Sequence, residues 1–211
     1  RNPASHCGIV GVKPSYGLVS RYGLIDLSMS LDQIGPFTKN VEDAALLLNI
    51  IKGKDELDIG SVNSKEITLK DVQKIKAGVL RIKGVDKQIQ NIVDEKISEL
   101  KKKSNWEIKE IEINHIDLAV QTYYLLVYAE FFSATRRFDG RRYGYKIEDK
   151  CGQEVLRRIL GGSEITRAEY AGRYYKKALE IKELIKEEFS NAFSGPKLGS
   201  SFYFNFGLQF L

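Results

Sequence analysis

The sequence has only two cysteines and two histidines, and it contains no long apolar run. Cys7 and Cys151 lie far apart without a Cys-x-x-Cys spacing, so we expect reduced, buried thiols in a cytoplasmic protein. His6 and His115 are joined by no carboxylate cluster, so we expect no metal site. No apolar stretch approaches membrane-spanning length and no signal peptide is recognisable, so we expect no membrane contact.

The overall composition is that of an ordinary globular protein. The 211 residues are 43% hydrophobic and 29% charged, enough for one sizeable core and one or two domains. Lysine and arginine number 33 against 28 acidic residues, and a net charge of +5 permits an RNA or acidic partner without requiring one. Because the first residue is Arg1, we expect a piece of a longer protein or a processed product.

Residues 1–43 are rich in glycine and proline at intervals that match neither a helix nor a strand. These residues are Gly8, Gly11, Gly17, Gly23 and Gly35, with Pro3, Pro14 and Pro36. Thin side chains let one backbone pass close to another strand or to a ligand. Composition alone therefore predicts a β-rich set of turns at a sheet edge.

The residue pattern in the middle of the chain predicts a strand, a helix and a second strand. Residues 76–82 and 106–113 have strand patterns, and a helix is predicted from Asp86 to Lys103 between them. Its apolar residues are expected to face inward: Ile89, Ile92, Val93, Ile97 and Leu100. This order is typical of an α/β unit with a parallel strand pair. An earlier helix is predicted between a cap at Asn40 and a stop at Gly53.

The second half of the chain is predicted to be mainly helical. Helices are expected over 116–137 and 153–160, with a corner at 139–144. A further helix is expected from Thr166 to Phe193, because Thr166 and Glu169 have the spacing of a capping box.

Three short motifs resemble one family. Arg1-Asn2-Pro3-Ala4, SRYGL at 20–24 and SLDQIGP at 30–36 are similar to the amidase signature family, most of all to its branch of glutaminase subunits from tRNA-dependent amidotransferases. The resemblance implies an α/β partial amidase-signature fold over 1–193, with a mixed sheet flanked by helices and a helical C-terminal half. Residues 194–211 depart from the pattern and are interpreted as an anomalous tail, arising from a deletion, a mis-joined gene or a remnant.

The resemblance also implies where the chemistry lies. The family uses a nucleophilic serine, a bridging serine held by a cis peptide and a neutral lysine. In the family pattern all three precede the position of Arg1, so we expect no catalytic residue in this sequence and no activity from the chain alone. The serines near its start are not expected to act as nucleophiles, since none lies in a Gly-Gly-Ser turn: Ser5, Ser15, Ser20, Ser28 and Ser30.

Two residues match the positions that contact free glutamine in the resembled branch. They are Tyr123, the first tyrosine of a Tyr-Tyr pair, and Arg158, the second arginine of an Arg-Arg-Ile motif. An arginine fork can bind the glutamine α-carboxylate, and a tyrosine hydroxyl can orient the substrate. Without the resemblance, packing between helices is the favoured explanation of Tyr123, and exposed surface charge is the favoured explanation of Arg158.

The function that the resemblance implies is that of a glutaminase subunit. Such a protein hydrolyses glutamine and passes ammonia to the B subunit of its complex, which uses ATP and Mg²⁺ to amidate Glu-tRNA(Gln) or Asp-tRNA(Asn). A small C subunit stabilises the complex of the glutaminase subunit with the B subunit. The glutaminase subunit contacts the tRNA only indirectly. We expect no cofactor in this chain itself. One alternative is another small-amide hydrolase of the same family.

A second alternative is an RNA-binding or assembly module. It is suggested by arginines interleaved with aromatic residues: Arg136, Arg137, Arg141 and Arg142, with Phe138 and Tyr143. We favour a structural corner in which Asp139 offsets part of the charge. His6 is expected to be a packing residue rather than an acid or a base.

Overall fold

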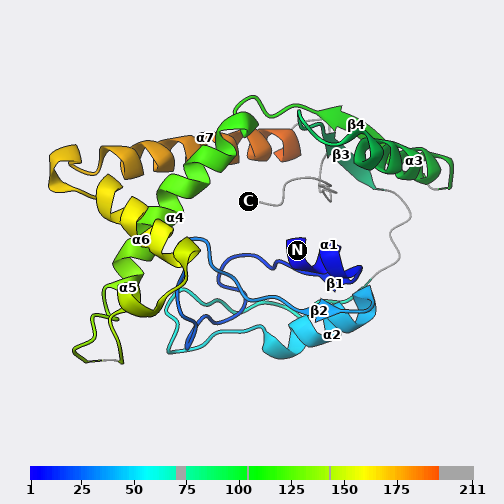
Figure 1. Ribbon diagram of the computed structural model, residues 1–211. Helices are drawn as coiled ribbons and strands as arrows, with labels where there is room; N and C mark the ends of the chain where they lie inside the picture. Colours follow the sequence, from blue (N-terminus) through cyan, green and yellow to red (C-terminus); the bar gives the residue numbers. More distant parts are fainter. Residues whose placement is uncertain (70–74, 104, 143, 195–211) are drawn as a thin grey trace. The chain divides into compact units, whose positions relative to one another are not determined.

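The computed structural model describes residues 1–69, 75–103, 105–142 and 144–194 (Figure 1). The chain divides into two compact units, each built from two separate stretches. Unit 1 contains Arg1–Lys70 and Leu125–Gly172, and unit 2 contains Asp71–Tyr124 and Arg173–Leu211. The anomalous tail lies outside the described residues, apart from Ser194 at the end of the last helix.

Unit 1 begins with the glycine-rich segment and adds helices from later in the chain. Its elements are α1 (Asn2–Cys7), β1 (Val10–Gly11), β2 (Phe37–Thr38), α2 (Val41–Ile51), the second part of α4 (Ala119–Thr135), α5 (Ile147–Lys150), α6 (Gln153–Ile165) and η2 (Ala168–Tyr170). The strands β1 and β2 pair antiparallel. The expected β-rich set of turns is therefore only partly correct, because Asn2–Cys7 form a helix with a proline in its first turn, a position that needs no N–H donor.

The glycines of this segment allow close backbone approach, as the sequence predicts. A Cβ atom at Gly35 would lie 1.9 Å from the carbonyl oxygen of Val12. One at Gly17, whose φ is 78°, would lie 2.3 Å from the carbonyl oxygen of Gly60. The predicted helix start is also confirmed, because the Asn40 side chain accepts a hydrogen bond of 2.7 Å from the backbone N–H of Asp43.

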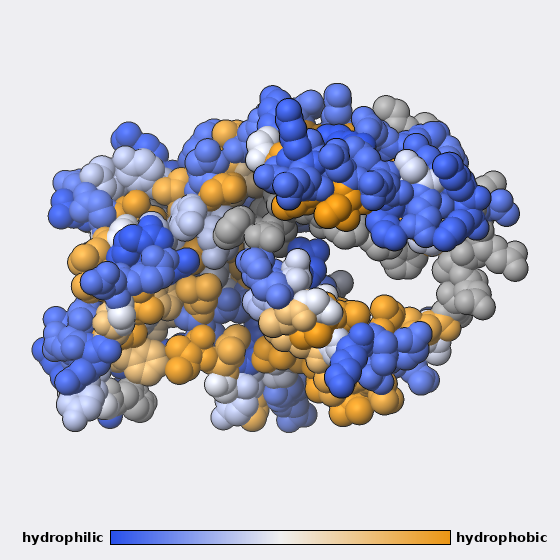
Figure 2. Space-filling model, turned by 45° about the vertical axis from the view of Figure 1, so that its right-hand side comes forward, coloured by the Kyte–Doolittle hydropathy of each residue, from blue (hydrophilic) through white to orange (hydrophobic). Residues whose placement is uncertain are grey.

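The outer side of α2 leaves several hydrophobic residues at the surface of unit 1. Leu46 and Ile50 are 63% and 69% exposed, whereas Ala44 and Leu48 are buried. Figure 2 shows hydrophobic residues at the surface around this helix. Only one narrow stripe of α2 therefore belongs to the core.

Helices α4 and α6 cross closely within unit 1. A Cβ atom at Gly162 would lie 2.1 Å from the carbonyl oxygen of Tyr128, and one at Gly161 would lie 2.7 Å from the Tyr128 ring. The two glycines thus allow α6 to continue to Ile165, beyond the predicted end at residue 160. Ile159 beside them is only 2% exposed.

The predicted capping box at Thr166 is wrong. The Thr166 hydroxyl donates a hydrogen bond of 2.7 Å back to the carbonyl oxygen of Gly162, so it ends α6 instead of starting the next helix. Ala171 and Gly172 then turn the chain with φ angles of 48° and 71°. The last helix, α7, begins at Arg173 and runs to Ser194.

Unit 2 contains the predicted strand–helix–strand order. Its elements are β3 (Lys76–Leu80), α3 (Lys87–Lys103), β4 (Glu107–Ile111), η1 (Ile116–Leu118), the first part of α4 and α7 (Arg173–Ser194). The strands β3 and β4 pair parallel, with Lys76 opposite Glu107 and Leu80 opposite Ile111. This confirms the α/β prediction and the helical second half of the chain.

The core of unit 2 lies between α7 and the segment after β4. Ile113, Ala119 and Ile185 are buried there. They pack against partly buried residues from both sides: Leu80, Ile116, Ile181, Phe189 and Ala192. Helix α3 contributes no buried residue, and Ile89 and Ile92 are 50% and 60% exposed, so the prediction that both face inward is wrong. The other three predicted inward residues of this helix are partly buried: Val93, Ile97 and Leu100.

Candidate functional site

The two arginines of α6 differ in their exposure to water. The side chain of Arg157 is 53% exposed, whereas that of Arg158 is only 18% exposed. Successive residues on a helix point about 100° apart, so one arginine faces outward while the next faces the protein. The interpretation of Arg158 as exposed surface charge is therefore wrong.

Glu154, one turn earlier on α6, bonds to both arginines. Its Oε1 accepts from Arg157 Nη2 at 2.7 Å and from Arg158 Nε at 2.8 Å, and its Oε2 accepts from Arg157 Nε at 2.8 Å. The hydrogen bond from Arg157 lowers the pKa of the Glu154 carboxyl to about 2, and the bond from Arg158 adds to this effect. Glu154 is therefore ionised at neutral pH.

Arg157 is connected in turn to α4. Its Nη1 donates to the hydroxyl of Tyr128, and its guanidinium carbon lies 5.4 Å from the centre of the Tyr128 ring. The Tyr128 ring also packs on Gly161 of α6. Sequence reasoning missed Glu154 and Tyr128, although the i, i+3 and i, i+4 spacing of Glu154 before the two arginines is a visible signal.

Tyr123 lies on the first part of α4, which belongs to unit 2. Its ring meets that of Tyr124 edge to face, with the ring centres 5.4 Å apart and the planes at 68°. Tyr123 is partly buried. Arg158 belongs to unit 1, so each predicted contact residue is described within its own unit.

The serines of the N-terminal segment contribute to structure. Ser28 is fully buried, and its hydroxyl donates to Glu130 Oε2 on α4 at 2.8 Å. Ser30 donates its hydroxyl to Glu130 Oε1 at 2.6 Å and its backbone N–H to Oε2 at 2.9 Å. A carboxylate that receives three such bonds holds residues 28–30 against the helix. Hydroxyls that donate to a carboxylate in this way are part of the packing of unit 1.

The arginine-rich corner is held by carboxylates that the sequence did not indicate. Arg136 pairs with Glu148 of α5, and Arg137 pairs with Asp26, each at 2.6 Å. Asp139, the predicted partner, instead accepts the backbone N–H of Arg141 at 2.9 Å. That bond is the main cause of a lowered pKa for Asp139. The pairing of Arg136 and Arg137 supports the structural corner over an RNA-binding surface.

The structure corrects two predictions about the cysteines and histidines, and it shows the partner of His115. Cys7 is exposed and Cys151 is partly exposed, so neither thiol is buried, although both are free. His6 lies exposed near the end of α1 and is not a packing residue, because the inward position of this short helix is taken by Ala4. His115 pairs with Glu188 of α7 at 2.6 Å within unit 2.

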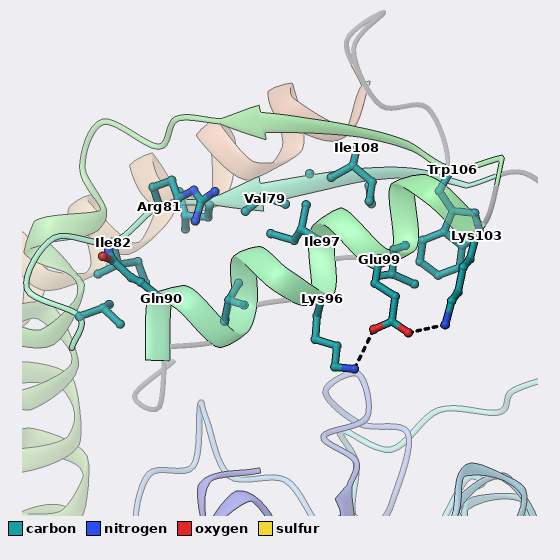
Figure 3. Close-up of a pocket in the computed structure, with 16 residues that line it drawn as sticks. Val79, Arg81, Ile82, Gln90, Lys96, Ile97, Glu99, Lys103, Trp106 and Ile108 are labelled. Atoms are coloured by element: carbon teal, nitrogen blue, oxygen red, sulfur yellow. Dashed lines mark hydrogen bonds and ion pairs between the residues drawn. The ribbon is translucent and has the colours of Figure 1, made fainter. Parts of the chain in front are cut away.

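A partly enclosed apolar cavity lies in unit 2 between α3 and the sheet (Figure 3). Its volume is about 400 Å³, and its lining includes Val79, Ile97, Trp106 and Ile108. At its rim Lys96 and Lys103 both bond to Glu99, at 2.8 and 2.6 Å. The walls are mainly apolar, with polar side chains such as Arg81 and Gln90 among them, and neither Tyr123 nor Arg158 lines this cavity.

Comparison with known proteins places this geometry in a family. The sequence model of the amidase family matches residues 1–196. The chain belongs to the amidase family. This confirms the resemblance that the motifs of residues 1–36 indicated. Among the described residues, none of the helices is long and apolar enough to cross a membrane.

Proteins similar to this amidase-family chain include A subunits of glutamyl-tRNA(Gln) amidotransferase. The A subunit of glutamyl-tRNA(Gln) amidotransferase from Methanocaldococcus jannaschii is 57% identical over 195 residues, which are 89% of this chain and 44% of that protein. The crystal structure of the A subunit of glutamyl-tRNA(Gln) amidotransferase from Thermotoga maritima matches with a TM-score of 0.67 and 37% identity, over 92% of this chain and 42% of that one. The chain thus spans just under half the length of these relatives.

A more distant structure shares the fold alone. Allophanate hydrolase of Kluyveromyces lactis matches with a TM-score of 0.67 at 19% identity, over 87% of this chain and 29% of that one. The amidase fold of the present chain is therefore common to proteins whose names describe different activities.

Proposed function

We propose that this chain supplies part of the glutamine-binding wall of the glutaminase (A) subunit of a tRNA-dependent amidotransferase. The names of its relatives and the sheltered position of Arg158 support the proposal. Arg158 binds the α-carboxylate of glutamine, and the hydroxyl of Tyr123 orients the substrate. A guanidinium that is mostly shielded from water pairs more strongly with a carboxylate than an exposed one does.

The reaction that this wall serves is the hydrolysis of glutamine to glutamate and ammonia. A serine attacks the side-chain amide, ammonia leaves, and water then releases glutamate from the acyl-enzyme. In this proposal no residue of this chain is the nucleophile, the bridging serine or the lysine base. The residues of this chain bind and orient the substrate, and none of them is assigned a proton transfer.

The ammonia then serves a second reaction on a partner. The B subunit of the complex, with ATP and Mg²⁺, activates the carboxylate of Glu-tRNA(Gln) or Asp-tRNA(Asn), and ammonia displaces the activating group. A C subunit stabilises the assembly, and this chain contacts the tRNA only indirectly. This chain holds no cofactor in the proposal, and the complex acts in the cytoplasm.

The proposal is tested with the complete protein in its complex, assayed with glutamine or with added ammonia. Arg158→Lys loses the planar fork, so we expect KM for glutamine to rise about a hundredfold while the ammonia-dependent reaction is retained. Tyr123→Phe removes one hydroxyl and is expected to raise KM about tenfold. Arg141→Lys, at an exposed arginine, is the control and should leave KM unchanged.

The outcome that contradicts the proposal is equally specific. An unchanged KM for glutamine in Arg158→Lys would remove Arg158 from the glutamine site. Equal loss of the glutamine-dependent and ammonia-dependent reactions would indicate a folding defect instead of lost binding. Turnover of other small amides at rates above that of glutamine would favour a different hydrolase of the family.

A further inference from the structure

We propose that Glu154 is a positioning residue for Arg158, and that Arg157 and Tyr128 hold Glu154 in place. The inference rests on the proposed function, in which Arg158 binds the substrate carboxylate. None of these three residues contacts the substrate in the proposal. Their role is to fix the direction in which the Arg158 guanidinium points.

The first observation is the shared carboxylate. Glu154 Oε1 accepts from both Arg157 Nη2 and Arg158 Nε, at 2.7 and 2.8 Å, and its other oxygen is occupied by Arg157 Nε. Arg157 thus binds the Glu154 carboxylate bidentately, through Nε and Nη2. A bond at Nε restrains the last torsions of the Arg158 side chain.

The second observation is that this group is anchored to another helix. Arg157 reaches Tyr128 of α4 through both the hydroxyl and the ring face. Tyr128 is itself fixed, because its ring and its carbonyl oxygen lie against Gly161 and Gly162. A connected series of contacts therefore runs from the α4 backbone to the Arg158 side chain, all within unit 1.

The third observation separates positioning from stability. The Glu154 side chain is 56% exposed, and exposed ion pairs contribute little to the free energy of unfolding. Loss of Glu154 should therefore leave the melting temperature nearly unchanged. The misdirected arginine, in contrast, should weaken substrate binding, because binding groups are sensitive to displacements of about 1 Å.

The experiment compares Glu154→Gln with Glu148→Gln in the complete protein and its complex. Both changes neutralise a carboxylate that pairs with an arginine of unit 1, but Glu148 pairs with Arg136. We expect Glu154→Gln to raise KM for glutamine about tenfold, with unchanged kcat, ammonia-dependent activity and melting temperature. Tyr128→Phe, which keeps the ring, should raise KM about threefold. Glu148→Gln should leave KM unchanged.

The outcomes distinguish this inference from the proposed function. If Arg158→Lys raises KM but Glu154→Gln does not, the positioning role is wrong and the proposed function stands. If Arg158→Lys has no effect on KM, the proposed function itself fails. If Glu154→Gln lowers the melting temperature and the ammonia-dependent activity along with glutamine use, Glu154 is structural and the inference is overturned.

Discussion

The contacts that stabilise the inside of unit 1 differ from those inside unit 2. Unit 1 is fixed by contacts that tolerate little change, such as Gly162 against the Tyr128 backbone and the buried carboxylate of Glu130. In unit 2, α3 buries no side chain and lies over a cavity of about 400 Å³. Its charged residues pair at the surface, as Lys96 and Lys103 do with Glu99. The difference shows that the contacts of α6 in unit 1 tolerate less change than those of α3 in unit 2.

The largest expected effect comes from equal truncations in the two units. Ile159→Ala on α6 removes a side chain that is 2% exposed and should lower the free energy of unfolding by about 3 kcal/mol. Ile97→Ala on α3 should cost only about 1 kcal/mol, because Ile97 already faces a cavity and makes fewer contacts. Urea unfolding followed by circular dichroism measures both. Equal costs would contradict the comparison.

Removal of the buried carboxylate should have the next largest effect. Glu130→Ala leaves the hydroxyls of Ser28 and Ser30 without their acceptor, and we expect a loss of about 2.5 kcal/mol. Glu130→Gln keeps one acceptor oxygen and should cost less. Urea unfolding gives the stability, and hydrogen exchange of residues 27–32 shows whether this loop is released. Unchanged exchange in Glu130→Ala would show that the loop does not depend on Glu130.

The helix crossing of unit 1 is tested by two glycines, one inside α6 and one at its start. Gly162→Ala places a methyl group against the Tyr128 carbonyl, so we expect destabilisation of about 2 kcal/mol. Gly152→Ala is the control, since a Cβ atom there meets nothing within 4 Å, and it should cost less than about 1 kcal/mol. Thermal unfolding distinguishes them. A similar loss in both variants would contradict a packing constraint at the helix crossing, because helix propensity alone predicts that Gly162→Ala stabilises the protein.

The smallest effect concerns two aspartates of unit 1 whose stability contributions depend on pH in opposite ways. The paired side chain of Arg21 holds the pKa of Asp58 well below its usual range, so the stabilisation is complete above about pH 4 and is lost as the pH falls. Burial raises the pKa of Asp32, so its contribution is greatest below about pH 4 and declines as the pH rises through the raised value.

Variants that remove the charge of each aspartate test the direction in which its stability contribution changes with pH. The stability difference between the wild type and Asp58→Asn should shrink as the pH falls below about 4. Relative to Asp32→Asn, the wild type should become less stable as the pH rises from about 4. Unfolding titrations at a series of pH values measure both differences. The same pH dependence in the two variants would contradict the assigned environments.

Local patterns predicted the regular elements well. The cap at Asn40 and the extent of α4 depend on contacts near in sequence, so they were visible without the structure. The pairing of β3 with β4 is long-range, but the order strand, helix, strand predicted it, because such units form parallel pairs. Errors arose where a residue had two possible partners. Thr166 has the spacing of a capping box, but its hydroxyl bonds backward to Gly162, a choice that the end of α6 decides.

The sequence by itself determined the family and most of the order of helices and strands, and its resemblance to the family suggested the two residues proposed to bind glutamine. Only the tertiary structure decided that Arg158 is sheltered while Arg157 is exposed, and that Glu154 and Tyr128 connect α4 to that pair. It also decided that the hydroxyls of Ser28 and Ser30 donate hydrogen bonds to Glu130, about a hundred residues away. The physical reason is that burial and long-range hydrogen bonds depend on which surfaces meet, and spacing along the chain does not record this.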